Sequence, residues 1–97
     1  MKRENKFQAD LIKELKLIFP ECVVVKNDPN YIQGIPDLLI LVGNKWAALE
    51  CKKSKTSSHR PNQDYYVNHL NSLGYAAFIY PENKEEVLNE LKSALRA

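Results

Sequence analysis

The chain has 97 residues, of which 44% are hydrophobic and 27% are charged, and its formal net charge is +2. A chain of this length has room for one hydrophobic core, so we expect a single domain over residues 1–97. The net charge is too small to indicate a polyanionic partner by itself, and no apolar run of the sequence is long enough to cross a bilayer.

The first predicted element is a helix from about Lys2 to Ile18, with an apolar side chain at every third or fourth position. Glu4 projects onto the same side as this apolar stripe. Two interpretations of Glu4 stay open. It lies in a frayed first turn, where it interacts favourably with the helix dipole, or it is an acid that reaches a functional site.

Three strands are predicted next, at Cys22 to Lys26, Leu38 to Val42 and Trp46 to Leu49. The last two are continuously apolar, which favours a sheet covered on both faces. The short turn Gly43-Asn44-Lys45 between them predicts an antiparallel hairpin. Asp37, at the start of one hairpin strand, is then expected near Glu50, at the end of the other.

The C-terminal part of the chain is predicted to form a helix, a strand and a helix. Pro61 suits the first turn of a helix that Gly74 ends, and a strand follows from Tyr75 to Tyr80. We expect Asn83 to cap the last helix, with Glu86 three residues later. The resulting order is αβββαβα, an α/β fold with a small mixed sheet flanked by helices.

A cluster of polar side chains is expected at one end of the hairpin. Side chains alternate along a strand, so Glu50 and Lys52 share a face about 7 Å apart, while Cys51 points the opposite way. Gln63 lies on the inward side of the helix that follows. A buried amide needs hydrogen-bond partners. We expect Gln63 to hold Lys52 or a nucleophilic water molecule at this site, and the alternative is that it caps its own helix within the loop.

A divalent cation is the natural complement to this cluster. The carboxylates of Asp37 and Glu50 repel each other and are costly to desolvate beside apolar strands, and Lys52 alone does not offset both. A hard ion such as Mg²⁺ or Mn²⁺ takes oxygen ligands and keeps waters and substrate phosphate in its other positions. The sequence therefore predicts a magnesium or manganese site.

A basic, hydroxyl-rich loop follows this site directly. Lysine and arginine attract phosphates, and serine and threonine hydroxyls hydrogen-bond phosphate oxygens without reading base sequence. The alternative is a solvated, mobile loop. The residues expected to bind a nucleic-acid backbone are Lys53, Lys55, Ser57 and Arg60. In the polar loop before Gly34, Tyr31 either stacks on a base or covers the core, and the sequence leaves both open.

Two motifs and a glutamine carry a resemblance to a known family. Gly34-Ile35-Pro36-Asp37, a hairpin and Glu50-Cys51-Lys52 resemble the signature of the PD-(D/E)XK nucleases. With Gln63 after them, the pattern resembles the VRR-NUC branch over nearly the whole chain. The resemblance implies a restriction-endonuclease-like core with the same element order, and a metal-dependent endodeoxyribonuclease that hydrolyses phosphodiester bonds.

The resemblance also adds residues to the site. We expect Asp37 and Glu50 to bind one or two Mg²⁺ ions, and the family pattern adds the backbone carbonyl of Cys51. An acid on the first helix of the family reaches the metal site, often through water, and Glu4 matches its position. Lys52 would orient the attacking water or stabilise the phosphorane-like charge.

Substrate and partners follow from size and resemblance. One small domain holds one cut site, so cutting both strands or both arms of a junction requires two copies, which predicts a homodimer. The family includes junction-resolving members, often viral. This favours branched or four-way junction DNA, recognised through backbone and shape, as the substrate of a phage-encoded enzyme.

Two rival functions have less support. A catalytically silent nucleic-acid-binding module on the same fold is disfavoured by the intact Asp37, Glu50 and Lys52. A small-molecule phosphate-binding protein would be expected to show a glycine-rich cradle at a helix N-terminus. The two cysteines form neither a Cys-x-x-Cys pair nor a Cys/His cluster, and the first residues are amphipathic rather than signal-like. We therefore expect a reducing, cytoplasmic location without a membrane anchor.

Overall fold

The computed structural model describes the backbone of residues 3–96 and the side chains of residues 5–96. Its elements follow one another in the order αβββαβα, as the sequence predicts. They are α1 (Arg3–Ile18), β1 (Val23–Lys26), β2 (Leu38–Val42), β3 (Lys45–Cys51), α2 (Pro61–Leu73), β4 (Tyr75–Ile79) and α3 (Lys84–Arg96). None of the helices in this part of the chain is both long and apolar enough to span a membrane.

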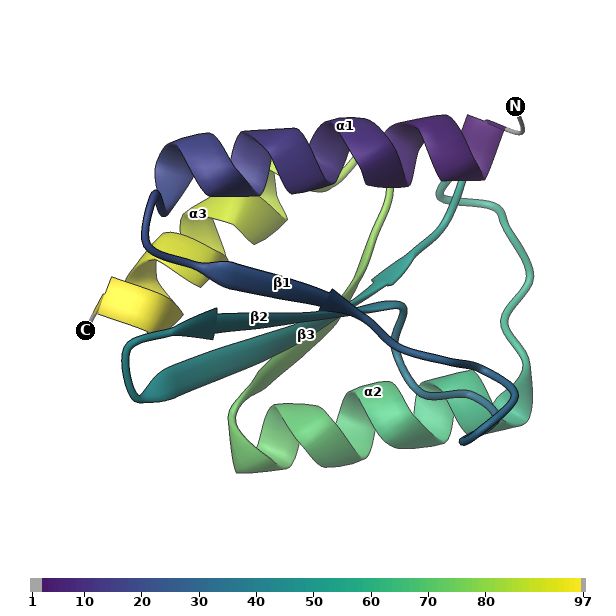
Figure 1. The fold of residues 1–97 in the computed structure, drawn as a ribbon. Helices are drawn as coiled ribbons and strands as arrows, with labels where there is room; N and C mark the ends of the chain where they lie inside the picture. Colours follow the sequence, from purple (N-terminus) through teal and green to yellow (C-terminus); the bar gives the residue numbers. More distant parts are fainter. Residues whose placement is uncertain (1–2, 97) are drawn as a thin grey trace.

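The four strands form one mixed sheet in the order β1-β2-β3-β4. The pairs β1–β2 and β2–β3 are antiparallel, which confirms the predicted hairpin, and β3–β4 is parallel. A parallel neighbour requires a crossover connection, and α2 supplies it. Helices α1 and α3 lie on one face of the sheet and α2 on the other (Figure 1).

The face under α1 and α3 holds the main core. Alternate residues of β2 and β3 point into it, as expected for strands, and the predicted apolar stripes of both helices meet them. The buried side chains of this core are Leu11, Leu15, Phe19, Leu38, Ile40, Val42, Ala47, Leu49, Cys51, Ile79, Val87, Leu88, Leu91 and Leu95. We call this side of the sheet the closed face.

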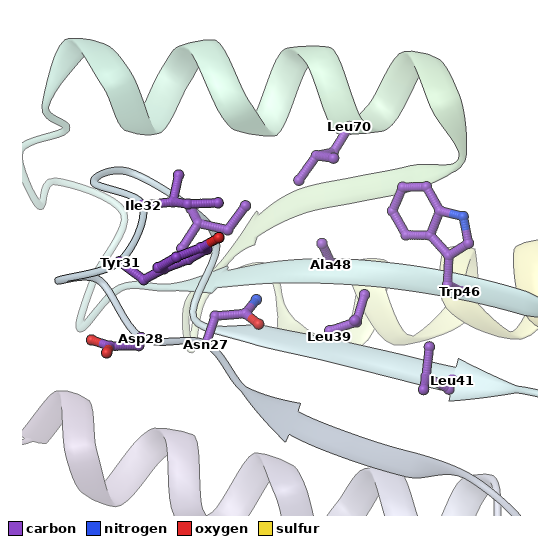
Figure 2. Close-up of a pocket in the computed structure, with 10 residues that line it drawn as sticks. Asn27, Asp28, Tyr31, Ile32, Leu39, Leu41, Trp46, Ala48 and Leu70 are labelled. Atoms are coloured by element: carbon purple, nitrogen blue, oxygen red, sulfur yellow. The ribbon is translucent and has the colours of Figure 1, made fainter.

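The opposite face is covered only in part. A smaller core of Ala48, Val67 and Ala76 lies under α2, which contacts β3 and β4. One helix that joins two neighbouring strands does not reach over the rest of the sheet, so Leu39 is half-buried and Leu41 is 38% exposed. The expectation that both hairpin strands are covered on two faces is correct for β3 and wrong for β2 (Figure 2).

Several element boundaries differ from the sequence prediction because the hydrogen-bonded pairing of neighbouring strands determines where each strand begins and ends. Lys45 pairs with Val42 and belongs to β3, so the hairpin turn is Gly43-Asn44 alone. β3 continues through Glu50 to Cys51 because its parallel pairing with β4 extends that far. Strand β1 begins one residue after Cys22, and β4 ends one residue before Tyr80.

Asn83 lies directly before α3 and its carbonyl accepts the Val87 amide, as expected of the residue that precedes the helix, but its side chain does not cap the helix. Its Oδ1 accepts a hydrogen bond from the Tyr80 amide at 2.8 Å, and its Nδ2 donates to the Phe78 carbonyl at 3.0 Å. Asparagine side chains readily hydrogen-bond to nearby backbone groups. The Asn83 side chain bonds to backbone groups at the end of β4 and not to the amides of α3. Asn83 therefore fixes the exit of β4.

Candidate active site

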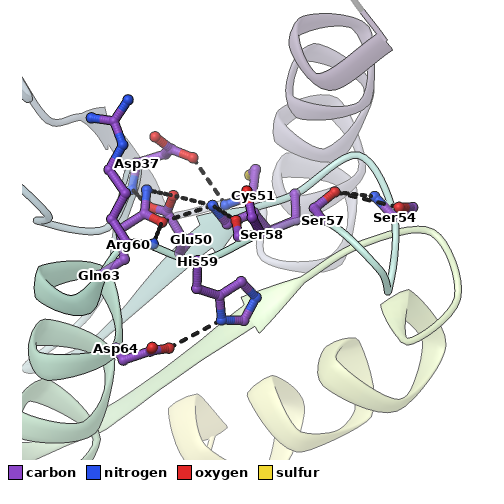
Figure 3. A network of polar contacts seen from close by, with 11 residues as sticks. Asp37, Glu50, Cys51, Ser54, Ser57, Ser58, His59, Arg60, Gln63 and Asp64 are labelled. Carbon is purple, nitrogen blue, oxygen red and sulfur yellow. Dashed lines mark hydrogen bonds and ion pairs between the residues drawn. The ribbon is translucent and has the colours of Figure 1, made fainter.

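The hairpin brings the two predicted acids together. Leu38 pairs with Leu49, so Asp37, just before β2, lies opposite Glu50 near the end of β3. Glu50 Oε1 accepts a hydrogen bond from the Asp37 amide at 3.2 Å, and Asp37 Oδ2 accepts one from the Cys51 amide at 2.9 Å (Figure 3). Each carboxylate is thus held by backbone of the other strand.

Gly34 explains the start of the Gly-x-Pro-Asp motif. Its φ is +87°, and a Cβ at this position would lie 2.7 Å from the backbone carbon of Asn62 in the first turn of α2. Only glycine accepts both the left-handed conformation and this close approach without strain. Asn27 holds the other side of the loop through a 2.8 Å hydrogen bond from Nδ2 to the Pro36 carbonyl. The loop is therefore fixed where it delivers Asp37.

Lys52 and Gln63 complete a buried network around Glu50. Glu50 is 3% and Lys52 8% exposed, and Lys52 Nζ lies 3.8 Å from Glu50 Oε2. Lys52 Nζ donates to Gln63 Oε1 at 2.8 Å and to the Ser58 carbonyl at 3.1 Å. Gln63 Nε2 donates to Glu50 Oε2 at 3.0 Å, and Gln63 Oε1 also accepts from the Arg60 amide at 3.1 Å. Both contacts proposed for this glutamine, with Lys52 and with its own helix start, are present.

Within this network the opposite charges of Glu50 and Lys52 offset each other. A buried charge is tolerated when an opposite charge and hydrogen bonds surround it, and a fully connected network restricts its members to one geometry. Within the described part of the chain, no buried side-chain nitrogen or oxygen is left without a hydrogen-bond partner. Glu50 and Lys52 are therefore held rigidly before any ligand arrives.

A cleft of about 270 Å³ opens in front of these groups. Asp37, Glu50, Gln63 and Arg60 line it, together with amide side chains from both walls, Asn30, Gln33 and Asn62. The sequence did not predict these three amides. Gln33 adjoins Gly34 and Asn62 adjoins Gln63 along the chain, but Asn30 adjoins neither, and all three reach the cleft only through the packing of the loop on α2.

The donor chemistry of the cleft fits a hard divalent cation. Asp37 and Glu50 supply carboxylate oxygens, and Mg²⁺ is commonly held by one or two carboxylates with waters in its other positions. No group of three or more acidic, histidine or cysteine side chains that could hold a metal occurs among the described residues. The Glu4 side chain lies outside the described part of the structure, so its predicted role is untested.

Cys51 can contribute to the site only through its backbone. Its side chain is fully buried in the core of the closed face, as the alternation of β3 predicts. The proposed ligand at this residue is its backbone carbonyl, which stays a prediction.

The structure divides the residues predicted to bind a nucleic-acid backbone. Arg60 lines the cleft. Lys53 and Lys55 are exposed on the loop after β3 and do not line it. The Ser57 hydroxyl accepts a hydrogen bond from the Ser54 amide at 3.2 Å, so it takes part in a turn of the loop itself.

His59 and Ser58 anchor this loop to the body of the protein. The His59 ring stacks on Phe78 with ring centroids 3.9 Å apart, and its Nδ1 lies 3.0 Å from Asp64 Oδ1 (Figure 3). The Ser58 carbonyl accepts from Lys52. These contacts tie the basic loop to β4, α2 and the candidate site, which argues against a detached, mobile segment.

Comparison with known proteins supports the fold. The structure is similar to that of Hjc, a Holliday junction resolvase from the archaeal hyperthermophile Archaeoglobus fulgidus, with a TM-score of 0.55. The chain has a resolvase-like nuclease fold. The two proteins share 18% sequence identity over 78% of this chain and 67% of the resolvase, so the likeness concerns the fold alone. No family model and no curated protein matches the sequence, and membership of the VRR-NUC branch stays a prediction.

Proposed function

We propose that this protein is a metal-dependent endodeoxyribonuclease of the VRR-NUC type that cuts branched or four-way junction DNA. The observation that carries the proposal is the meeting of the Asp37 and Glu50 carboxylates beside the buried ammonium of Lys52, at the wall of an open cleft. A resolvase-like fold supports the same class of reaction. Buried charges that border a cleft are a feature of many functional sites.

Asp37 and Glu50 would hold the metal ion, Mg²⁺ or Mn²⁺, with the Cys51 carbonyl and Glu4 as the further ligands that the family resemblance adds. When bound, such an ion polarises the phosphodiester, lowers the pKa of a bound water and neutralises the charge of the leaving oxygen. The protein contributes a fixed pair of carboxylates. Hydrogen bonds from backbone amides hold both carboxylates in place.

Lys52 acts in this proposal as an electrostatic group. Its ammonium is fixed by Gln63 and the Ser58 carbonyl and borders Glu50. A cation in this position orients the attacking water or stabilises the negative charge that builds up on phosphorus-bound oxygens. Gln63 is a positioning residue, because it bonds to both Lys52 and Glu50.

DNA would be held through its backbone. Arg60 lines the cleft and would contact a phosphate next to the cut. Lys53 and Lys55 would contact phosphates farther along, and Ser57 would add a hydroxyl contact. Such contacts position the nucleic acid without reading its bases, so shape selects the substrate. Paired cuts in a junction require two active sites, and we propose a homodimer.

Cleavage assays with a matched pair of variants test the proposal. Four-way junctions, flaps, plain duplex DNA and RNA are incubated with Mg²⁺ or Mn²⁺ and with wild type, Asp37→Asn or Asp10→Asn. Asp10 is exposed on α1, where it pairs with Lys6, so its replacement makes the same chemical change away from the cleft. We expect wild type and Asp10→Asn to cut junctions, and Asp37→Asn to lose at least about 100-fold in rate.

Two outcomes contradict the proposal. Undiminished cutting by Asp37→Asn would remove this carboxylate from the reaction. Binding of junctions by the wild type without cutting, in the presence of either metal ion, would favour the catalytically silent binding module instead.

A further inference from the structure

Three amide side chains line the candidate catalytic cleft without a role in its hydrogen-bond network. Asn30 and Gln33 belong to the loop after β1, and Asn62 lies in the first turn of α2. Asn30 and Gln33 are exposed, and Asn62 is half-buried. Among the described residues, none of these three side chains forms a hydrogen bond with the protein. They are therefore available to a ligand, unlike Gln63, whose amide bonds to the protein at both ends.

The loop after β1 presents its amides from a fixed backbone. The Asp28 carboxylate accepts a hydrogen bond from the Asn30 amide at 2.8 Å, which closes a turn of the loop. Farther along, Gly34 packs so closely on α2 that an added Cβ would lie 2.7 Å from the backbone carbon of Asn62. Gln33 directly precedes this glycine, so the same contact brings it close to Asn62.

The charges of the cleft favour an uncharged group as the ligand of these amides. The charged side chains among the described residues that line it are Asp37, Glu50 and Arg60. In the proposed function the two acids hold the metal ion and Arg60 contacts one phosphate. A further phosphate would be expected to have a further cation beside it. An amide side chain instead offers a donor and an acceptor together, which is the pattern that the edge of a nucleobase presents.

The shape of the cleft selects an unpaired base. Bases within a duplex are read by helices or strands that protrude into a groove of the DNA, whereas these amides line a recess of about 270 Å³. A base must therefore leave the stack to reach them. Unstacking costs least where the base is already unpaired, as it is at a flap or a branch point.

Tyr31 adds an aromatic surface next to the cleft. It lines an apolar groove of about 520 Å³ that adjoins the cleft, since Ile35 lines both (Figure 2). Tyr31 is 85% exposed, so it does not cover the core. An exposed aromatic ring provides a face on which any base can stack. Of the two interpretations that the sequence leaves open for Tyr31, the structure therefore favours stacking.

We propose that the cleft binds one unpaired nucleobase of the DNA strand, through the amides of Gln33 and Asn62 with Asn30 beside them. The inference rests on the proposed function, because it places this base next to the phosphate that is cut. It adds a base contact to the backbone contacts proposed for the basic loop. The substrate is thereby narrowed to branched DNA that carries an unpaired nucleotide at the cut site.

Binding of two matched flap DNAs tests this base site without cleavage. The two DNAs differ only in the unpaired nucleotide at the branch point, which carries adenine in one and is abasic in the other. Adenine is used because its N6 and N7 accept a two-point contact from an amide side chain. Fluorescence anisotropy is measured without divalent metal. We expect wild type to bind the adenine flap at least about 5-fold more tightly than the abasic flap, as one good amide–base pair does.

Three variants assign this preference to the amides. Asn62→Ala and Gln33→Ala are each expected to lower the adenine-to-abasic affinity ratio by at least about 2-fold, with the affinity for the abasic flap unchanged. Asn68→Ala is the control, because Asn68 is exposed on the same helix and does not line the cleft. Circular dichroism checks that each variant folds. Gln33→Ala changes an exposed side chain, so it keeps the test valid if Asn62→Ala disturbs the packing on Gly34.

The proposal is overturned if wild type binds both flaps equally, or if the ratio is unchanged in Asn62→Ala and Gln33→Ala. An equal loss of affinity for both flaps in these variants would assign the amides to phosphates and would also overturn it. A wild type that discriminates between the flaps but cuts neither with Mg²⁺ or Mn²⁺ would keep the base site and refute the nuclease. A wild type that cuts both and binds them equally would do the reverse.

Discussion

The two faces of the sheet differ in what they contribute. The closed face carries the larger core, and helices α1 and α3 cover it. The α2 face has a small core, an open half and, at one end, the candidate site. The larger core therefore lies on one side of the sheet, while the groups proposed for catalysis lie on the other.

Strand β3 shows this division residue by residue. Ala47, Leu49 and Cys51 point into the closed-face core, while Ala48 lies under α2. Continued alternation places Glu50 and Lys52 on the α2 side, where Gln63 meets both of them. β3 thus connects the core to Glu50 and Lys52. This connection explains how a small domain holds two buried charges in one position.

Truncation of the closed-face core is expected to have the largest effect on stability. Leu15→Ala removes a fully buried side chain and should cost about 2–5 kcal/mol of unfolding free energy. Leu17→Ala, on the same helix but 81% exposed, should change it by no more than about 0.5 kcal/mol. Urea denaturation followed by circular dichroism measures both. Equal losses would show that the closed face does not dominate stability.

A change in the loop before Asp37, the proposed catalytic acid, is expected to have a smaller effect on stability and a clear effect on cleavage. Gly34→Ala adds a Cβ at a left-handed residue that touches Asn62, which should cost about 1–3 kcal/mol and displace Asp37. Gly43 is also left-handed, with φ +59°, but nothing lies within 4 Å of an added Cβ. Gly43→Ala should therefore cost about 1–2 kcal/mol and leave cleavage unchanged.

Urea denaturation and junction-cleavage rates are measured for both glycine variants. The comparison separates backbone strain, which both variants introduce, from displacement of Asp37, which only Gly34→Ala is expected to cause. If Gly34→Ala cuts as fast as Gly43→Ala, the close packing of the loop on α2 is not what positions Asp37.

The sequence predicted the architecture because strong local patterns determine it. Helical spacing indicated α1 and α3, Pro61 and Gly74 bounded α2 correctly, and the short turn with Gly43 indicated the hairpin that brings Asp37 to Glu50. The proximity of Asp37, Glu50 and Lys52 was predicted in the same way. Asp37 precedes one hairpin strand and Glu50 ends the next, so antiparallel pairing brings them close together.

Other features depend on tertiary packing and were missed or mistaken. The apolar run from Leu38 to Val42 looks the same whether α2 covers its second face or leaves it open, so the exposure of Leu41 was not predicted. The Asn83 side chain can reach several backbone groups, and its spacing in the sequence does not predict that it bonds to Tyr80 and Phe78. The cleft wall at Asn62 exists only because Gly34 lets the loop approach α2.

Calorimetric titration of Mn²⁺ and Mg²⁺ tests the central claim that Asp37 and Glu50 form a divalent-cation site. The titration compares wild type with Asp37→Asn and with the control Asp10→Asn. We predict saturable uptake by the wild type and by Asp10→Asn, and loss of that uptake in Asp37→Asn. No uptake by the wild type, or equal uptake by all three proteins, would contradict the account.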